Sequence, residues 1–259
     1  MIFRKVHSVS VSRESWLEPL QAHRGSAQNP EFENTLEAFR HAKKSGFRMI
    51  EMDVRLTLDK VPIVFHDHDL KRMASKDTFV SDCTFAEIQK ELPQVSSLED
   101  VLLSTDIPEK INLEIKYETT WPVEACLEIS KVVEKTQTHD RLMFSSFHPL
   151  ALSMMSVFLP DIPRGLLVTD EDHEKNKWYL KKRLFQGLAQ VHFLNLDYQM
   201  VPVDSVKIWK ESHVPLILWT VNDLDLIRAY LQAGAVSIIT DLIPADIGQL
   251  VMDAVHLSG

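Results

Sequence analysis

Short apolar runs recur along the chain, and they alternate with longer segments in which apolar residues are spaced by three or four positions. The runs are typical of buried parallel strands, and the spacing is typical of amphipathic helices. Eight strands are expected, at residues 20–22, 49–54, 111–115, 142–145, 165–168, 193–196, 216–221 and 237–240. Eight alternating strand and helix units predict an α/β fold of the closed TIM (β/α)8 barrel type. An open doubly wound sheet is the alternative.

Segments between the expected strands carry the helical spacing. Two clear examples have their apolar positions at Leu36, Phe39 and Ala42, and at Val123, Leu127, Val132 and Val133. A last helix is expected to begin at Pro244 and run to about Ala254, since proline is favoured at the first helical position. Residues 67–97 interrupt the alternation with a polar segment between the second strand and its helix, which we interpret as a lid or small insertion. The whole chain, 1–259, is expected to form one domain, because α/β barrels of this length commonly have a single core.

The composition is that of an ordinary soluble globular protein, with 45% hydrophobic and 25% charged residues. A formal net charge of −9 disfavours nucleic acid as a partner, because binding to a polyphosphate requires a basic surface. Cys83 and Cys126 lack the spacing of a disulfide framework or a zinc ribbon and fit a reducing cytoplasm. Residues 1–15 contain no apolar run long enough for a signal peptide, and no run elsewhere reaches the roughly 18 residues of a membrane span. The sequence leaves the oligomeric state open.

Three carboxylates interrupt two otherwise apolar strands. Glu51 and Asp53 are two residues apart, so both side chains point to the same face of their strand, and Glu114 lies on the next strand near Lys116. The C-terminal ends of the strands form the active site in enzymes of the barrel fold. Clustered carboxylates would repel one another unless a cation neutralised them, and an all-oxygen set suits Mg²⁺ or Ca²⁺ better than zinc or copper. The alternative interpretation is that these residues are salt-bridged or face solvent.

Two histidines follow strands at the same expected end of the barrel. His23 follows the first strand, and His66 follows the apolar run 63–65. Imidazole can act as an acid or a base near neutral pH, so the two histidines could assist the cleavage of a phosphodiester. Arg24 offers a bidentate contact to phosphate oxygens, while Lys116 offers a point charge. Together with a metal, these residues would provide the local positive site that an acidic chain needs for a phosphate-bearing small molecule.

Further short motifs accompany these residues along the chain. The set consists of His23-Arg24-Gly25, residues 33–39, Gly46, residues 50–54, 57–59 and 64–67, Leu70, Arg72, residues 112–116, Ser146-Phe147, and residues 219–222 and 239–241. In order and spacing it resembles the glycerophosphodiester phosphodiesterase family. Each motif alone is a weak signal, but the ordered set spans nearly the whole chain and is specific.

The resemblance implies a TIM barrel with a short insertion after strand 2 and a hydrolase that converts glycerophosphodiesters to glycerol 3-phosphate and an alcohol. Such an enzyme would act in glycerol and lipid metabolism in the cytoplasm and would bind a divalent metal, Mg²⁺ or Ca²⁺. A glycerol hydroxyl of the substrate can be the nucleophile, giving a cyclic phosphate that water opens, or water can attack directly. The residues carried over are Glu51, Asp53 and Glu114 for the metal, His23 and His66 for acid and base catalysis without a division of roles, and Arg24 and Lys116 for the phosphate.

Some positions depart from the family pattern or allow two interpretations. Phe32 stands where the family usually has a proline, so the loop above the site is expected to differ, and Lys60 replaces the glycine that a tight hairpin turn favours. Trp219 is either an apolar wall that faces the substrate or a core residue. Asn34 and Thr35 either orient the site or cap the following helix.

Three rival functions are consistent with parts of the sequence. The first is a catalytically inactive barrel that binds phosphate esters, and the second is an isomerase or aldolase. Enzymes of the second kind use a glycine-rich phosphate loop after strands seven and eight, whereas residues 223–225 and 241–243 contain no glycine. The third is a lysophospholipase D-type phosphodiesterase, which would need an apolar trough for an acyl chain near residues 67–97 and 170–187.

Overall fold

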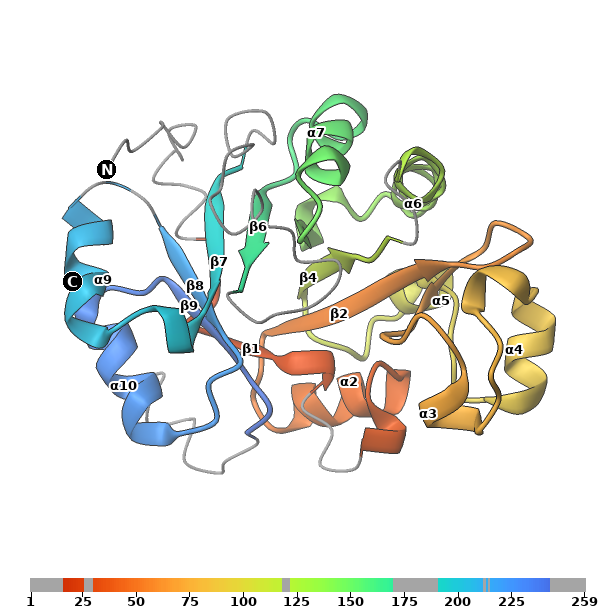
Figure 1. Ribbon diagram of the computed structural model, residues 1–259, viewed down its shortest axis with the longest axis horizontal. Helices are drawn as coiled ribbons and strands as arrows, with labels where there is room; N and C mark the ends of the chain where they lie inside the picture. The colour runs from red at the N-terminus through yellow and green to blue at the C-terminus, as the bar shows by residue number, and fades with distance from the viewer. Residues whose placement is uncertain are drawn as a thin grey trace.

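The computed structural model describes residues 16–25, 30–117, 122–169, 191–211, 213 and 215–242. In this part of the chain, eight parallel strands form a barrel in the order β1-β9-β8-β7-β6-β5-β4-β2 (Figure 1). The barrel closes where Ala22 of β1 pairs with Ile50 of β2, which confirms the TIM barrel and excludes an open sheet. The strands are β1 (Leu20–Ala22), β2 (Met49–Leu56), β4 (Lys110–Ile115), β5 (Leu142–Ser146), β6 (Arg164–Val168), β7 (Phe193–Asp197), β8 (Leu216–Trp219) and β9 (Ser237–Thr240).

Helices cover the outer face of the barrel. The described ones beside the strands are α2 (Leu36–Lys44), α5 (Leu98–Leu103), α6 (Val123–Thr136), α7 (Pro149–Phe158), α9 (Val203–Glu211) and α10 (Leu224–Ala233). Their buried residues pack against outward-facing strand residues such as Ile50, Leu113 and Phe144 to form the main apolar core. None of the described helices combines the length and the apolarity needed to cross a bilayer.

Every second side chain of each strand points to the barrel axis. Towards the N-terminal ends of the strands, these inward side chains contribute to a separate apolar cluster that contains Leu17, Met49, Met143, Phe193, Ile217 and Ile239. Further along β2, the same face carries Glu51, Asp53 and Arg55. The apolar cluster therefore lies below the carboxylates, which face the C-terminal ends of the strands.

Two elements differ from what their sequence pattern predicts. Helix α6 buries Cys126, Ile129, Ser130 and Val133. Of the positions that the apolar spacing marked, Val133 is thus buried and Val132 packs against the core, whereas Val123 and Leu127 are exposed. Strand β2 continues to Leu56 because its last residues pair antiparallel with β3 (Pro62–Val64). Lys60, in the turn between β2 and β3, has a φ of 65°, the left-handed conformation that glycine adopts more readily. The helix expected after Pro244 lies outside the described residues.

The segment 67–97 is a small helical insertion, as the sequence predicts for the region after strand 2. It contains α3 (Lys71–Ala74) and α4 (Phe85–Glu91), which lie at the right-hand edge of Figure 1, on the opposite side from α9 and α10. It is less polar than its sequence suggests, because its apolar residues are turned inward. With β3 they form a second core of Ile63, Phe65, Leu70, Val80, Cys83, Ile88, Leu92 and Val95.

A close approach inside the barrel generates a stability prediction. A Cβ atom added at Gly165 would lie 2.5 Å from the side-chain oxygen of Asn195, which is fully buried. Gly165→Ala should therefore lower the free energy of unfolding by about 1–3 kcal/mol, as overpacking does. The measurement is urea unfolding of the single variants and of a double variant with Asn195→Ala. If the clash is the cause, the cost of Gly165→Ala should be smaller in the Asn195→Ala background, and equal costs in the two backgrounds would contradict this explanation.

Candidate active site

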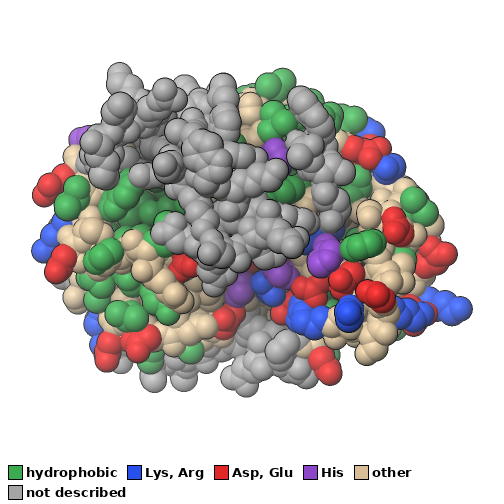
Figure 2. Space-filling model, in the orientation of Figure 1, with side chains coloured by type: hydrophobic (Ala, Val, Ile, Leu, Met, Phe, Trp, Pro, Cys, Tyr) green, Lys and Arg blue, Asp and Glu red, His purple; other side chains and the backbone are tan. Residues whose placement is uncertain are grey.

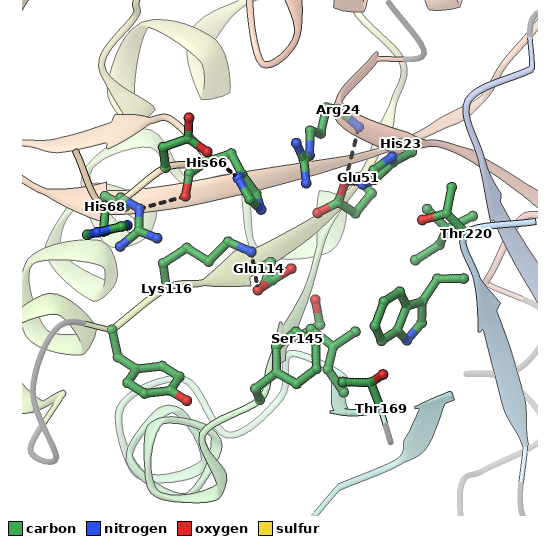
Figure 3. Close-up of a pocket in the computed structure, with 17 residues that line it drawn as sticks. His23, Arg24, Glu51, His66, His68, Glu114, Lys116, Ser145, Thr169 and Thr220 are labelled. Carbon is green, nitrogen blue, oxygen red and sulfur yellow. Dashed lines mark hydrogen bonds and ion pairs between the residues drawn. The ribbon is translucent and has the colours of Figure 1, made fainter. Parts of the chain in front are cut away.

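A cavity of about 440 Å³ opens at the C-terminal ends of the barrel strands. Figure 3 shows its charged side chains on one side and hydroxyl-bearing side chains on the other. The charged and histidine residues that line it are His23, Arg24, Glu51, Arg55, His66, Asp67, His68, Glu114 and Lys116. The rest of the wall consists of Tyr117, Ser145, Phe147, Leu167, Thr169, Trp219, Thr220 and Ile239. On the molecular surface, Figure 2 shows histidine, basic and acidic side chains gathered below the centre of one face.

Glu51, Asp53 and Glu114 form a compact buried triad. The parallel register of β2 and β4 places Asp53 directly opposite Glu114, and the two-residue spacing of β2 puts Glu51 on the same inward face. One carboxylate oxygen from each residue lies within 4.8 Å of the others. All three side chains are buried, with relative exposures of 4%, 1% and 8%. The structure thus brings together the three carboxylates that the sequence singled out.

Two cationic side chains reach into the triad. The Nζ of Lys116 lies 2.8 Å from an oxygen of Asp53 and 2.5 Å from one of Glu114. The Nε of Arg24 lies 3.3 Å from the other oxygen of Asp53, and the backbone N–H of Arg24 donates to Glu51 at 3.1 Å. Burial by itself lowers the pKa of Lys116, but the charges of Asp53 and Glu114 outweigh it and raise that pKa.

Two carboxylates of the triad have pKa values that are shifted in opposite directions, and the two cations do not fully compensate the negative charge of the triad. Burial and the charge of Asp53 raise the pKa of Glu51 to about 8. Burial would also raise the pKa of Asp53, but Lys116, His66 and Arg24 hold it well below its usual range. A cluster of buried carboxylates in which one tends to keep a proton fits a divalent cation with oxygen ligands, because such an ion would replace both the proton and the missing positive charge.

The ring of His23 is oriented by a carboxylate that follows the last strand. Its Nδ1 lies 2.5 Å from an oxygen of Asp241, whose other oxygen accepts a hydrogen bond from the amide of Asn222 at 2.7 Å. The Nε2 of His23 lies 4.0 Å from Glu51. Burial lowers the pKa of His23, but the hydrogen bond with Asp241 and the charge of Glu51 outweigh it and raise that pKa overall.

His66 is held in the same way by a different loop. Its Nδ1 lies 2.7 Å from an oxygen of Asp67, and the other oxygen of Asp67 accepts a hydrogen bond from the Nε of Arg72 at 2.6 Å. Burial raises the pKa of Asp67, but the hydrogen bonds from His66 and Arg72 bring it below its ordinary value. Each histidine therefore uses its Nδ1 for a carboxylate, and its Nε2 is the nitrogen left for chemistry.

The turn after β1 requires an unusual backbone. Arg24 has a φ of 49° and Gly25 a φ of 84°, both in the left-handed region. A Cβ atom at Gly25 would lie 2.8 Å from the Cβ of Ala38 and 2.9 Å from the ring of Phe39. Glycine at this position lets α2 pack directly against the turn that carries His23 and Arg24.

Asn34 and Thr35 have different roles: one contacts the site, and the other caps the helix that follows. The side chain of Asn34 donates to a carboxylate oxygen of Asp53 at 2.8 Å and accepts from the backbone N–H of Asp53 at 3.1 Å. The hydroxyl of Thr35 accepts from the backbone N–H of Ala38 and caps α2. Asn34 thus orients the site, and Thr35 begins the helix.

An aromatic wall faces the charged side of the cavity. Trp219 lines the cavity, its indole N–H donates to the backbone oxygen of Asn195 at 2.9 Å, and its ring meets Phe147 edge-on at 5.6 Å. The interpretation of Trp219 as a wall residue thus agrees with its position. His148 is not part of the lining: it caps α7 and packs against Tyr117, which does line the cavity.

Every residue that the sequence marked for the site lies at this cavity or in its buried triad, but several others were missed. Asp67 and Asp241 hold the histidines, and Arg55 lines the cavity. Arg55 could have been found from the sequence, because it continues the inward alternation of Glu51 and Asp53 on β2. Asp241 lies in a motif that the resemblance had used, but nothing local to that motif indicates contact with His23.

Known proteins of one family are similar to the chain over most of its length. The model of the family described as "Glycerophosphoryl diester phosphodiesterase family" matches residues 23–244. The chain is similar to a glycerophosphodiester phosphodiesterase of Caldanaerobacter subterraneus subsp. tengcongensis, with 27% identity over 85% of this chain and 92% of the relative. It is also similar to one of Bacillus altitudinis, with 29% identity over 85% of this chain and 93% of the relative.

A solved structure shares the barrel over nearly its full length. It is that of an Oleispira antarctica phosphodiesterase in complex with the product sn-glycerol-3-phosphate. The TM-score is 0.77 at 25% sequence identity, and the match covers 92% of this chain and 98% of the other. The family match extends from the histidine after β1 to beyond the last strand, and the chain therefore belongs to the glycerophosphoryl diester phosphodiesterase family.

Proposed function

We propose that the protein hydrolyses glycerophosphodiesters to glycerol 3-phosphate and an alcohol, with His23 and His66 as acid and base beside a divalent metal. The observation that carries this proposal is the meeting of the buried carboxylate triad and two carboxylate-held histidines around one cavity. An inactive phosphate-binding barrel would not need two oriented imidazoles next to three buried carboxylates. Membership of the phosphodiesterase family supports the reaction class.

Glu51, Asp53 and Glu114 would hold the metal, Mg²⁺ or Ca²⁺. Their oxygen atoms suit both ions, and their burial explains why a cation is required there. When bound, such an ion supplies positive charge that stabilises the negative phosphate oxygens during hydrolysis.

Arg24 and Lys116 would contribute further positive charge for the phosphate. Both side chains line the cavity, and both already balance triad carboxylates. The planar guanidinium of Arg24 can bind two phosphate oxygens at once, whereas Lys116 acts as a single positive centre. Trp219 and Phe147 would form the apolar wall that excludes water from one side of the substrate.

The two histidines would move protons through Nε2. In each ring Nδ1 faces a carboxylate, so Nδ1 carries the proton and Nε2 is free to accept one as a base or, once protonated, to donate one as an acid. One histidine would take a proton from the nucleophile, either a glycerol hydroxyl of the substrate or water. The other would protonate the departing alkoxide.

A lysophospholipase D-type activity is the alternative within the same reaction class. It would need an apolar trough for an acyl chain, and the insertion 67–97 contributes only Asp67 and His68 to the cavity. The apolar residues of the insertion are buried in its own core. Segment 170–187 lies outside the described residues. The described part of the mouth therefore favours a small glycerophosphodiester.

We also propose that residues 1–259 form one domain and that the protein works in a reducing, cytoplasmic compartment in glycerol and lipid metabolism. The pairing of β1 with β9 supports a single domain, because the first and last described strands are neighbours in one barrel. Cys83 and Cys126 are both free and buried, which supports a compartment where disulfides are not needed.

The first prediction of this proposal concerns the metal. Chelation should abolish turnover, Mg²⁺ or Ca²⁺ should restore it, and the melting temperature should rise on adding the ion, because a ligand at a hundredfold its Kd stabilises the folded state by about 2.7 kcal/mol. Glu114→Gln should weaken the metal-dependent shift in melting temperature. Glu99→Gln is the control, since Glu99 pairs with Lys135 on the outer helices. Full activity after exhaustive chelation would contradict the proposal.

The second prediction concerns the histidines. His23→Ala and His66→Ala should each lower kcat by roughly 10² to 10⁴, the usual contribution of a general acid or base. A nitrophenyl diester needs little protonation of its leaving group and should rescue only the variant that lacks the acid. His41→Ala, on the exposed side of α2, is the control and should keep wild-type kcat. Wild-type kcat in both site variants, with metal binding intact, would exclude the two-histidine mechanism.

The third prediction concerns the substrate. Glycerophosphodiesters should be cleaved with a higher kcat/KM than lysophospholipids, because the described cavity wall offers a short apolar surface rather than a long trough. The measurement is a parallel assay of both substrate classes, each with and without metal. A preference for lysophospholipids would favour the lysophospholipase D alternative.

A further inference from the structure

A chain of alternating charges connects the two sides of the active site outside the triad. The Nη1 of Arg24 donates to Oε1 of Glu33 at 3.1 Å, and the same oxygen accepts a short hydrogen bond from Nη2 of Arg72. The Nε of Arg72 then donates to Asp67, which holds His66. Glu33 is largely buried, with 13% of its side chain exposed. One oxygen of Glu33 therefore bridges Arg24, which is proposed to bind phosphate, and Arg72, which supports the Asp67–His66 pair.

The position of Glu33 is fixed by its neighbour in the chain. Asn34 has a φ of 57°, its backbone N–H donates to the backbone oxygen of Arg24, and its side chain makes two hydrogen bonds with Asp53. These contacts hold the loop before α2 against both β2 and the turn after β1. The carboxylate of Glu33 consequently has a defined place beside Arg24, and its contact with Arg24 is not one of the adjustable ion pairs of an open surface.

Glu33 competes with Asp53 for Arg24. The Nε of Arg24 already lies 3.3 Å from Asp53, which is one of the proposed metal ligands. Without the negative charge of Glu33, the guanidinium of Arg24 would face the guanidinium of Arg72 without compensation and would be drawn further towards Asp53. Glu33 thus keeps Arg24 available for an anionic ligand and leaves Asp53 for a cation.

Arg72 depends on its planar shape as well as on its charge. Two of its nitrogens bind two different carboxylates, Asp67 and Glu33, so the rigid guanidinium fixes the spacing between them. Arg72 belongs to α3 of the insertion, which has its own apolar core. Through Arg72, α3 therefore supports the site, and lysine could not make both contacts in the same geometry.

We propose that Glu33 and Arg72 are positioning residues, which together hold Arg24 and the His66–Asp67 pair at a fixed spacing. They also keep the guanidinium of Arg24 from moving closer to the carboxylate of Asp53. This inference rests on the proposed phosphodiesterase function. It assigns a role to the insertion after strand 2, which is to hold the residues of the site in place through Arg72.

The test uses Glu33→Gln, Arg72→Lys and their double variant in the full-length protein, with a glycerophosphodiester as substrate. Glu33→Gln should raise KM and the Kd for inorganic phosphate about tenfold, and it should also weaken Mg²⁺ binding measured by calorimetry, because Arg24 moves towards Asp53. Arg72→Lys keeps the charge and should still lower kcat by about 10-fold to 100-fold, a loss typical of small misplacements of a catalytic group. The double variant should lose less than the product of the single losses, because both residues act through one bridge.

The matched control is Lys76→Gln, which breaks the ion pair with Glu91 within the same insertion and should keep wild-type kinetics. Thermal melts of all variants identify any loss that arises from unfolding. The inference would be overturned if the wild type were active and both single variants had kcat and KM within twofold of the wild-type values. It would also be overturned if the loss of the double variant equalled the product of the two single losses. If the wild type cleaved no diester, the proposed function would be wrong. The affinities for phosphate and Mg²⁺ test the further inference without turnover, and unchanged affinities in Glu33→Gln would overturn it.

Discussion

The mutual repulsion of Glu51, Asp53 and Glu114 is the constraint on which the rest of the site depends. Three carboxylates in a buried space are costly unless positive charge is brought to them, since an uncompensated buried charge costs several kcal/mol. Lys116 and Arg24 bring positive charge into direct contact with the triad. The raised pKa of Glu51 shows that this compensation is incomplete. A site with this remaining deficit is suited to bind a divalent cation and then a phosphate ester.

The barrel strands carry the carboxylate triad, and the segments beyond the strands carry the histidines and the residues that hold them. Strands β2 and β4 carry the triad at positions fixed by their hydrogen-bond register. The turns and loops beyond the strands carry the histidines and their partners Asp67 and Asp241. The same division applies to Glu33 and Arg72, which belong to the loop before α2 and to the insertion. Loops at this end of a barrel can change partners without disturbing the strands, which is why the fold accommodates many reactions.

The success and failure of the sequence predictions have physical reasons. The carboxylate triad was predictable because alternation along a strand is strict, so Glu51 and Asp53 had to share a face. The buried face of α6 was predictable only in part, because Val133 is buried as expected but Val123 and Leu127 are exposed, while Cys126, Ile129 and Ser130 pack inward. A helix has apolar residues on more than one side, and only the neighbouring elements decide which side is buried.

By itself, the sequence determined the number and order of the eight barrel strands, the carboxylates, the two histidines and the basic residues beside them. All of these depend on residue type and on spacings of a few positions, which the chain carries locally. The tertiary structure alone decided the partners of those residues. His23 meets Asp241, 218 positions away, because β1 lies beside β9 when the barrel closes. Glu33 meets Arg72, 39 positions away, because the insertion packs on its own core and brings α3 against the loop before α2. Contacts between distant segments follow from closure and packing, which no local pattern of residues encodes.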